Sequence, residues 1–345
     1  MKIAILNLSN NITTMGTVSS GETIMIGEVL KSANHDVTII SKTDTENTIS
    51  FENVKDINEY DKLIVVNGSI NFFGGVENPI ITNNYKLMAQ YKDTIYYLFT
   101  DIKLPFKQLW PMIEKRGWGY SKEDVWVTSD IKVISQGRNL DVTRSLHKNS
   151  EVVHFPLEQY YLFLHNDISD EKEKTTDIIY GGSYRSGARE KKMVEYLFDI
   201  EPFEATMFGN IREKQFKKVP YTTPPKFDKK VKISEMRNKL GEGYATLIIG
   251  DPQYYDNFIT LRVWEAMTSN AVILIDEDFD SNHTIIDDDR FYVSNKQELI
   301  SALDKIKNNE LYRSELLNVQ AQRVLNAFNK EAWLNNFMEV LDFEN

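Results

Sequence analysis

The chain of 345 residues contains no cysteine, which excludes disulfide bonds, thiolate metal ligands and a cysteine nucleophile. It has no apolar run near the ~18 residues that a membrane-spanning helix needs, so we expect no contact with a membrane. The start, MKIAILNLSN, turns polar at Asn7, which predicts a buried strand and not a secretion signal. These absences favour a cytoplasmic protein.

The chain also lacks an overall positive charge, because its net charge is −11. That total argues against a nonspecific nucleic-acid-binding protein, but the charge is unevenly distributed. Residues 214–239 hold nine Lys and Arg against two acidic residues, whereas residues 276–289 hold seven acidic residues and no basic one. Both segments are interpreted most simply as solvated surfaces, and the basic one alternatively as a surface for polyanions.

Short apolar runs alternate with helix-like stretches along nearly the whole chain, which predicts parallel sheets covered by helices on both faces. Two series of strands indicate two doubly wound α/β domains, in keeping with about 150 residues per domain. The first series is expected at 2–6, 37–40, 63–66, 94–100, 131–135 and 152–155. The second is expected at 177–181, 204–208, 245–250, 271–276 and 291–293.

The domain boundary is expected at the polar segment 166–176, which we interpret as a linker. It would separate a first domain, 1–165, from a second domain, 177–329. After residue 293 the pattern is purely helical, with helices expected at 296–307, 310–328 and 330–341. We expect the C-terminal helix, within 330–345, to pack back on the first domain.

The loop GGSYRSG, 181–187, follows an expected strand and precedes an expected helix. Glycines allow close approach of a ligand, and a helix N-terminus attracts anions. Ser183, Arg185 and Arg189 add donors that suit phosphate oxygens. The motif is neither GxGxxG nor a P-loop. An anion site and a tight turn with surface arginines therefore both remain open.

Three other segments place charged side chains near the ends of expected strands, where ligands bind in such folds. Arg262 and Glu265 share one helix face, as a surface ion pair or as ligands of a phosphate and a ribose. Asp101 follows the strand at 94–100, as a turn residue or as a general base. Glu22 begins a helix, either because it complements the helix dipole or because it binds a sugar hydroxyl.

The five histidines show no metal-ligand spacing, and Asp287, Asp288 and Asp289 are interpreted as a solvated turn. No essential metal site is therefore expected.

Several longer segments together resemble the DNA β-glucosyltransferases of T-even bacteriophages. They are VVNGSINFFGG (65–75), YYLFTDIKLPF (96–106), KVISQGRNLD (132–141), IYGGSYRSGARE (179–190), FGNIREKQF (208–216), LIIGDPQYYDNFITLRVWE (247–265) and FYVSNKQELI (291–300). The resemblance covers residues 1 to about 300 and weakens through the terminal helices.

The resemblance implies a GT-B fold, in which two Rossmann-like domains face each other across a cleft. The first domain would bind the DNA acceptor and the second the UDP-sugar. The implied enzyme is an inverting glycosyltransferase that moves glucose from UDP-glucose to 5-hydroxymethylcytosine in duplex DNA, after the base has flipped out of the helix. It would need no obligatory cofactor, although Mg²⁺ or Mn²⁺ would help UDP to leave. It would act as a monomer in the cytoplasm of an infected bacterium, with a role in restriction evasion.

The resemblance also implies the roles of individual residues. Asp101 matches the general base that deprotonates the acceptor hydroxyl. The residues implied for the UDP-sugar are Glu22, Ser183, Arg185, Arg189, Phe208, Gly209, Val231, Asp251, Tyr254, Arg262 and Glu265. Those implied for the DNA acceptor are Asn71, Phe72, Phe73 and Arg116.

Two segments depart from the family pattern, the loop 12–21 and the stretch 227–239, which includes Val231. The loop is expected near the sugar, so a different donor on the same DNA acceptor, such as a pentose nucleotide, stays open as an alternative. A transferase acting on lipid or polysaccharide is disfavoured because no basic, aromatic, amphipathic helix is found. A non-catalytic binding protein is disfavoured because Asp101 and the donor residues are all present.

Overall fold

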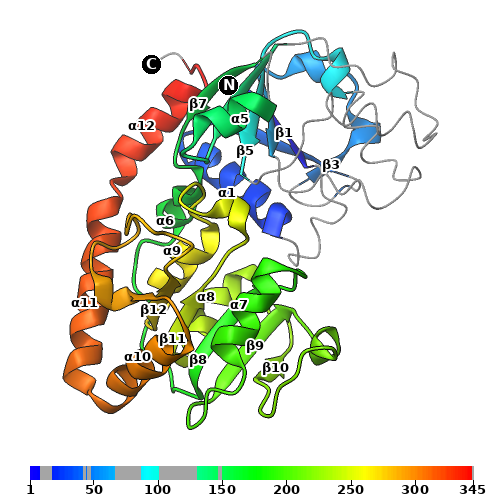
Figure 1. Ribbon diagram of the computed structural model, residues 1–345. Helices are drawn as coiled ribbons and strands as arrows, with labels where there is room; N and C mark the ends of the chain where they lie inside the picture. The colour runs from blue at the N-terminus through cyan, green and yellow to red at the C-terminus, as the bar shows by residue number, and fades with distance from the viewer. Residues whose placement is uncertain are drawn as a thin grey trace. The chain divides into compact units, whose positions relative to one another are not determined.

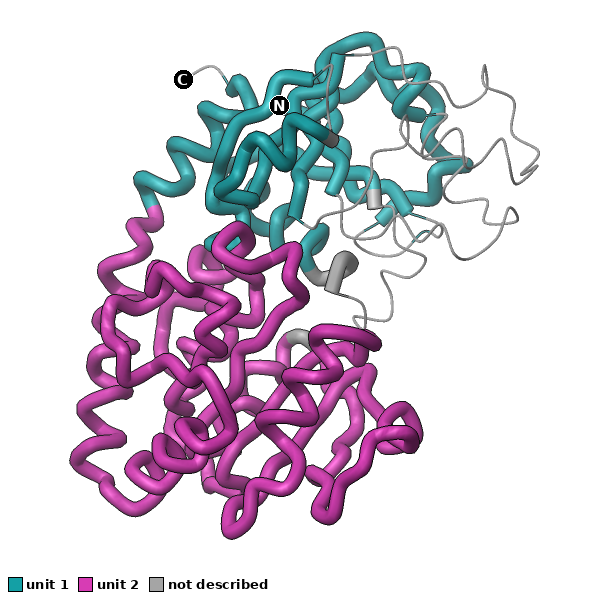
Figure 2. Tube along the Cα trace, in the orientation of Figure 1, with its two compact units in different colours: residues 1–160, 331–345 teal, residues 161–330 magenta. Residues whose placement is uncertain are grey.

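The computed structural model describes residues 1–7, 18–41, 44, 48–66, 87–100, 130–146 and 150–343. The chain divides into two compact units, which Figure 2 shows in different colours. Unit 1 comprises residues 1–160 and 331–345, and unit 2 comprises residues 161–330. The prediction of two parallel α/β domains is confirmed, whereas the roles assigned to them remain predictions.

Unit 1 is built on a parallel seven-stranded sheet in the order β3-β2-β1-β4-β5-β6-β7. The strands are β1 Lys2–Asn7, β2 Asp36–Ser41, β3 Thr48–Ser50, β4 Lys62–Val66, β5 Ile95–Phe99, β6 Ile131–Ser135 and β7 Glu151–His154. Ile3, Ala4, Ile5 and Leu6 are all fully buried, as expected for a strand covered on both faces.

The helices of unit 1 are labelled in Figure 1. Those with both ends in the described part of the chain are α1 Val18–Ser32, α5 Leu140–Leu146 and α12 Lys330–Val340, with short 3-10 turns η1 Phe51–Asn53, η2 Ile57–Glu59 and η4 Leu157–Gln159. Within this unit, Trp333 of α12 donates to the carbonyl of Pro156 at 3.1 Å, and Phe337 stacks on Phe155. Beyond α12, Lys132 donates to Asp342 at 2.7 Å. These contacts attach the C-terminal segment to the first sheet.

Unit 2 contains a parallel six-stranded sheet in the order β10-β9-β8-β11-β12-β13. Its strands are β8 Thr176–Ser183, β9 Ala205–Asn210, β10 Lys226–Asp228, β11 Gly243–Ile248, β12 Val272–Asp276 and β13 Tyr292–Val293. In both units the first strand of the series lies next to the fourth, which is the arrangement of a Rossmann fold.

The helices of unit 2 are α6 Tyr160–Leu164, which begins one residue before the unit does, α7 Ala188–Leu197, α8 Ile233–Leu240, α9 Leu261–Met267, α10 Lys296–Asn308 and α11 Glu310–Ala327. The 3-10 turns are η5 Glu213–Phe216, η6 Pro252–Tyr254 and η7 Asp289–Phe291. The expected linker 166–176 is bonded into this unit, because Lys174 donates to the carbonyls of Gly241 and Asn270 at 2.9 and 2.8 Å.

Candidate functional site

The best-defined candidate site of unit 2 lies where its strand order reverses, between β8 and β11. The connections leave these two strands in opposite directions, so a crevice forms beyond their carboxyl ends. Ser183 ends β8 and is exposed there, and Asp251 follows the end of β11 and is buried. Two residues expected at the donor site thus flank this reversal.

Two glycines allow the strands β8 and β9 to approach each other closely. Gly182 is paired with Gly209, which has a φ of +113°, and a Cβ on Gly209 would lie 2.1 Å from the carbonyl oxygen of Gly182. Phe208 is fully buried, and its ring occupies the space that a side chain on Gly181 would need. Phe208 therefore supports the loop by packing, and its contact with the donor remains a prediction.

Arg185, in the GGSYRSG segment, and Arg189, in the helix that follows it, both contact the carboxylate of Asp251. Arg185 Nη1 donates to Asp251 Oδ2 at 2.9 Å, and Arg189 Nη2 lies 2.8 Å from the same oxygen. The buried Nε of Arg189 has no hydrogen-bond partner among the described residues. A buried charged donor without an acceptor is costly, so this side chain is suited to an anionic ligand.

Arg262 and Glu265 form the second half of the site, on α9. Arg262 Nη1 lies 2.7 Å from Glu265 Oε2, and Glu265 is only 2% exposed. Burial raises the pKa of Glu265, and the positive charge of Arg262 acts in the opposite direction. The distance between the two atoms is that of an ion pair. Among the described residues, however, Arg262 Nη1 has no partner that also meets the angular requirements of a hydrogen bond. The pair is thus partly buried, unlike the surface pair considered from the sequence.

A buried tyrosine lies among these charged groups. Burial raises the pKa of the Tyr180 hydroxyl, and the charges of Arg189, Arg262, Asp251 and Arg185 all act on it. Tyr180 was not predicted as a site residue from the sequence, although it directly precedes the glycine loop. The charges of three guanidinium groups and of the Asp251 carboxylate therefore act on this one hydroxyl, and such a set of charged donors can bind an anion.

The remaining predicted donor residues lie at the same edge of the sheet. Val231 is half-buried and follows β10, and Tyr254 is buried in η6. The segment continues through further turns, so α9 begins only at Leu261, with Thr260 at its N-cap.

Unit 1 brings Glu22 to the end of β5. Thr100 Oγ1 donates to Glu22 Oε2 at 3.2 Å, and both residues are buried. Helix α1 begins at Val18, so Glu22 does not lie in its first turn, which weakens the interpretation based on the helix dipole. Asp101, Asn71, Phe72, Phe73 and Arg116 lie outside the described residues.

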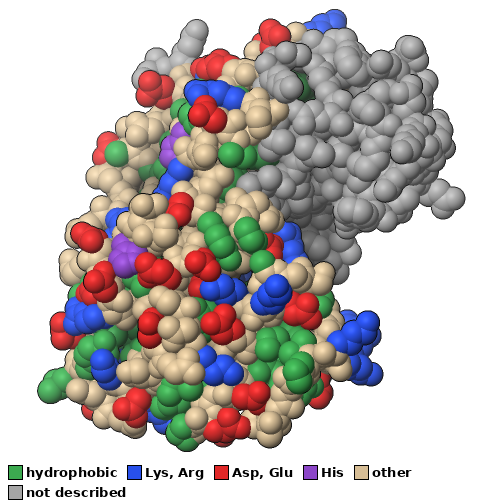
Figure 3. All heavy atoms as spheres, viewed as in Figure 1, with side chains coloured by type: hydrophobic (Ala, Val, Ile, Leu, Met, Phe, Trp, Pro, Cys, Tyr) green, Lys and Arg blue, Asp and Glu red, His purple; other side chains and the backbone are tan. Residues whose placement is uncertain are grey.

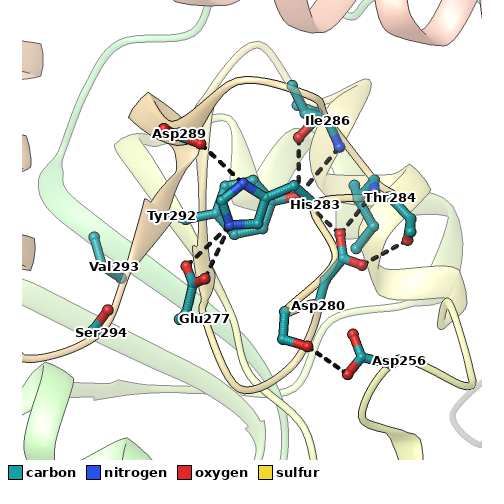
Figure 4. Close-up of polar contacts among 12 residues, drawn as sticks. Asp256, Glu277, Asp280, His283, Thr284, Ile286, Asp289, Tyr292, Val293 and Ser294 are labelled. Atoms are coloured by element: carbon teal, nitrogen blue, oxygen red, sulfur yellow. Dashed lines mark hydrogen bonds and ion pairs between the residues drawn. The ribbon is translucent and has the colours of Figure 1, made fainter.

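The acidic segment 276–289 is not simply a solvated surface. Asp276, at the end of β12, is fully buried, and its Oδ1 accepts from Lys192 at 2.8 Å and from Tyr196 at 2.7 Å. His283 lies between Glu277 and Asp289 and stacks on Tyr292, as Figure 4 shows. The hydrogen-bonded structure of this segment was not apparent from its composition.

Within the described residues, no group of three or more His, Asp or Glu side chains is placed to hold a metal ion. No helix in that part of the chain is long and apolar enough to cross a membrane.

Comparison with known proteins settles the family. The DNA beta-glucosyltransferase of Enterobacteria phage T4 is 48% identical to this chain over 352 residues, which cover 99% of this chain and 100% of that protein. This chain belongs to the T4 β-glucosyltransferase family. The family model described as bacteriophage T4 beta-glucosyltransferase matches residues 1–161.

Solved structures of the family agree with the fold. An aspartate-to-alanine variant of the phage T4 enzyme in complex with UDP-glucose matches with a TM-score of 0.92 and 48% identity. The T4 enzyme in complex with UDP and Mn²⁺ matches with a TM-score of 0.91 and 48% identity. In both comparisons 99% of this chain and 100% of the other are covered. The GT-B fold class predicted from the sequence is confirmed, and the chain is a glycosyltransferase by family.

Proposed function

We propose that this chain transfers glucose from UDP-glucose to the hydroxymethyl oxygen of 5-hydroxymethylcytosine in duplex DNA, with inversion at the anomeric carbon. The observation that carries the proposal is the 48% identity, over the full length of both chains, with a DNA β-glucosyltransferase. A pentose donor finds no support among these relatives, since the T4 complex holds UDP-glucose.

The donor would bind at the strand reversal of unit 2. Arg189 carries a buried donor that lacks an acceptor within the described residues, and Arg262 is a second partly buried cation of the site, so both are assigned to the diphosphate, together with Arg185 and Ser183. The carboxylate of Glu265 accepts from the ribose hydroxyls. The backbone at Val231 is assigned to the uracil. The contacts of Tyr254, Gly209 and Phe208 with the donor belong to the same proposal.

Asp251 has a supporting role in this scheme. Its carboxylate contacts both Arg185 and Arg189, which holds the two guanidinium groups near each other before the donor arrives. A site organised in advance loses less free energy in ordering its side chains when the ligand binds.

The reaction is a single displacement. Asp101 accepts the proton of the hydroxymethyl group while its oxygen attacks the anomeric carbon, and the bond from that carbon to the UDP oxygen breaks. The departing diphosphate gains negative charge, which the arginines of unit 2 stabilise. Glu22 is assigned to a hydroxyl of the sugar, next to the base, because it contacts Thr100.

The target cytosine must leave the stacked duplex to reach Asp101, at a cost of a few kcal/mol. Phe72 and Phe73 are assigned to support the flipped state by stacking, and Asn71 and Arg116 to polar contacts on the acceptor side. The enzyme would act as a monomer in the cytoplasm of the infected host.

No metal is required by this scheme. A divalent cation such as Mg²⁺ or Mn²⁺ would bind through the diphosphate and neutralise part of its charge, which favours departure of UDP. In the T4 enzyme, Mn²⁺ is found together with UDP.

The proposal is tested by following UDP release from UDP-glucose in the presence of two duplexes that differ only in 5-hydroxymethylcytosine or cytosine. Release that depends on the hydroxymethyl group supports the proposal. Equal release with both duplexes would mean that the chain only hydrolyses UDP-glucose, and would contradict the proposal.

A further inference from the structure

An exposed strip of positive charge adjoins the donor site of unit 2. Between residues 212 and 232, eight Lys and Arg stand against Glu213 and Asp228, in a chain whose net charge is −11. Lys226 lies 3.5 Å from Asp228. The other seven form what we call the basic rim: Arg212, Lys214, Lys217, Lys218, Lys229, Lys230 and Lys232.

The basic rim is not neutralised by the protein itself. All seven side chains are exposed, and none forms an ion pair within the residues that the structure describes. The neighbouring Lys239 is different, because it contacts Asp228 at 2.8 Å and Glu242 at 2.6 Å. Clustered cations without counter-charges repel one another, and an anionic partner would relieve that repulsion.

The topology places the basic rim beside the glycine loop. Residues 212–218 follow the carboxyl end of β9, and residues 229–232 follow the carboxyl end of β10. The two strands are parallel neighbours, and Asp228 is paired with Phe208. The next residues along the two strands are Lys229 and Gly209, so Lys229 leaves the sheet beside the glycine of β9. In Figure 3, Lys and Arg side chains gather at the lower right edge of the molecule, where Figure 1 places β10.

An aromatic contact ties the basic rim to the donor loop. Phe216 is fully buried and meets Tyr184 edge-on, with ring centroids 5.3 Å apart. Tyr184 lies between Ser183 and Arg185, and Lys217 directly follows Phe216. The lysines are therefore held at a defined place relative to the residues assigned to the diphosphate.

Between α7 and η5 lies a groove of about 810 Å³. Four lysines line it, together with two glutamates: Lys191, Lys214, Lys217, Lys218, Glu190 and Glu195. One of these glutamates, Glu190, already accepts a hydrogen bond from the Tyr184 hydroxyl at 2.9 Å. The groove thus presents more positive than negative charge to a ligand.

We infer that the basic rim binds the phosphate backbone of duplex DNA. Flexible, solvated lysines at several separate points suit a partner with a regular row of charges, and duplex DNA carries one negative charge per ~1.7 Å of its axis. Lysine and arginine side chains contact the phosphates of DNA irrespective of sequence, so the rim would position the duplex and not select its bases. The inference rests on the proposed function, which supplies DNA as the acceptor.

The test measures binding of a fluorescently labelled, unmodified duplex by anisotropy at about 50 to about 200 mM salt. Lys217→Glu/Lys218→Glu should weaken binding by about tenfold, and should lower the slope of log Kd against log salt by about two. Lys217→Gln/Lys218→Gln should show a smaller loss in the same direction. Affinity for UDP should not change in either variant.

The matched control is Lys172→Glu/Lys305→Glu, which carries the same charge change in the same unit. Lys172 precedes β8, and Lys305 lies near the end of α10. Two residues after Lys305, the amino group of Lys307 lies 2.7 Å from the carboxylate of Asp177, which is at the amino end of β8. These lysines thus lie at the opposite edge of the sheet, and DNA affinity should stay near that of the wild type. Equal affinity and salt slope in the rim variant and this control would overturn the inference.

The outcome is independent of the proposed activity. If the wild type modifies hydroxymethylated DNA while the rim variant binds DNA normally, only the inference fails. If the wild type binds DNA through the rim but transfers no glucose, only the proposed function fails.

Discussion

The hydroxyl of Thr100 donates to the carboxylate of Glu22 across a separation of 78 residues in the chain. Thr100 directly follows β5, and the next residue is Asp101, the proposed general base. Glu22, the residue assigned to the sugar, therefore contacts the residue that directly precedes the proposed base in the chain.

Glu22→Gln should lower kcat/KM for UDP-glucose by about ten- to a hundredfold, because a hydrogen bond to a charged group contributes about 1.5–3 kcal/mol. Steady-state kinetics with hydroxymethylated duplex measures this. The control is Glu28→Gln on the same helix, where the exposed Glu28 contacts Lys31 at 3.0 Å. Identical kinetics for the two variants would remove Glu22 from the site.

Asp101→Asn should reduce transfer by about 10²- to 10⁴-fold, the usual contribution of a general base. Binding of UDP-glucose, measured by calorimetric titration, should survive, because the donor contacts are assigned mainly to unit 2. Asp93→Asn is the control, since Asp93 is exposed and precedes the same strand. Normal turnover by the Asp101 variant would refute its assignment as the base.

Arg262→Ala should weaken UDP binding by about ten- to a hundredfold, because it removes a charged donor from the diphosphate. It also leaves the buried Glu265 without its partner. Arg262→Lys keeps the charge beside Glu265 but loses the planar fork of donors, so an intermediate loss is expected. Titration with UDP measures both variants. Wild-type affinity in both would place the diphosphate elsewhere.

Gly209→Ala should destabilise unit 2 by more than about 2 kcal/mol, because positive φ and a close backbone contact both penalise the new side chain. The matched control is Gly187→Ala, since Gly187 has a φ of +99° but its Cβ would meet nothing within 4 Å. That variant carries only the conformational cost, on the order of 1–3 kcal/mol, and should therefore lose less than Gly209→Ala. Thermal unfolding compares them, and equal losses would mean that the approach of Gly182 and Gly209 is unimportant.

His283 should make stability depend on pH. Burial acts to lower its pKa, but the hydrogen bond to Glu277 and the charges of Glu277 and Asp289 raise it above the ordinary value overall. The stabilisation is therefore complete below about pH 6.5 and is lost as the pH rises through the raised value. His283→Asn, which tolerates the φ of +51°, loses the stacking on Tyr292 at every pH and the ionic contribution only at low pH, so its deficit relative to wild type should be larger at low pH, by less than about 1 kcal/mol. Parallel unfolding curves at all pH values would contradict this.

The fold was largely predictable because its strands are buried on both faces and so form continuous apolar runs. Every expected strand of both series is present. The strands β3 and β10 were missed because each has three residues of which only one is apolar, so neither forms an apolar run. The boundary was less predictable, because a charged segment such as 166–176 can still bond to one unit through its backbone and Lys174.

The candidate site was predictable only in part. Arg185, Arg189, Arg262 and Glu265 were found because they follow strand ends in recognisable segments. The contacts of Arg185 and Arg189 with Asp251 depend on the order of the strands, which no local pattern contains. The basic rim was visible as composition, but only the burial of Phe216 places its lysines beside the donor loop.

The central claim is that this chain moves glucose to hydroxymethylated DNA. The most direct measurement is nucleoside mass analysis of a 5-hydroxymethylcytosine duplex, incubated with the protein and equal amounts of UDP-glucose and a UDP-pentose and then digested. The account predicts that 5-hydroxymethylcytosine is replaced by its monoglucosylated form. A pentosylated nucleoside, or unmodified 5-hydroxymethylcytosine after complete incubation, would contradict it.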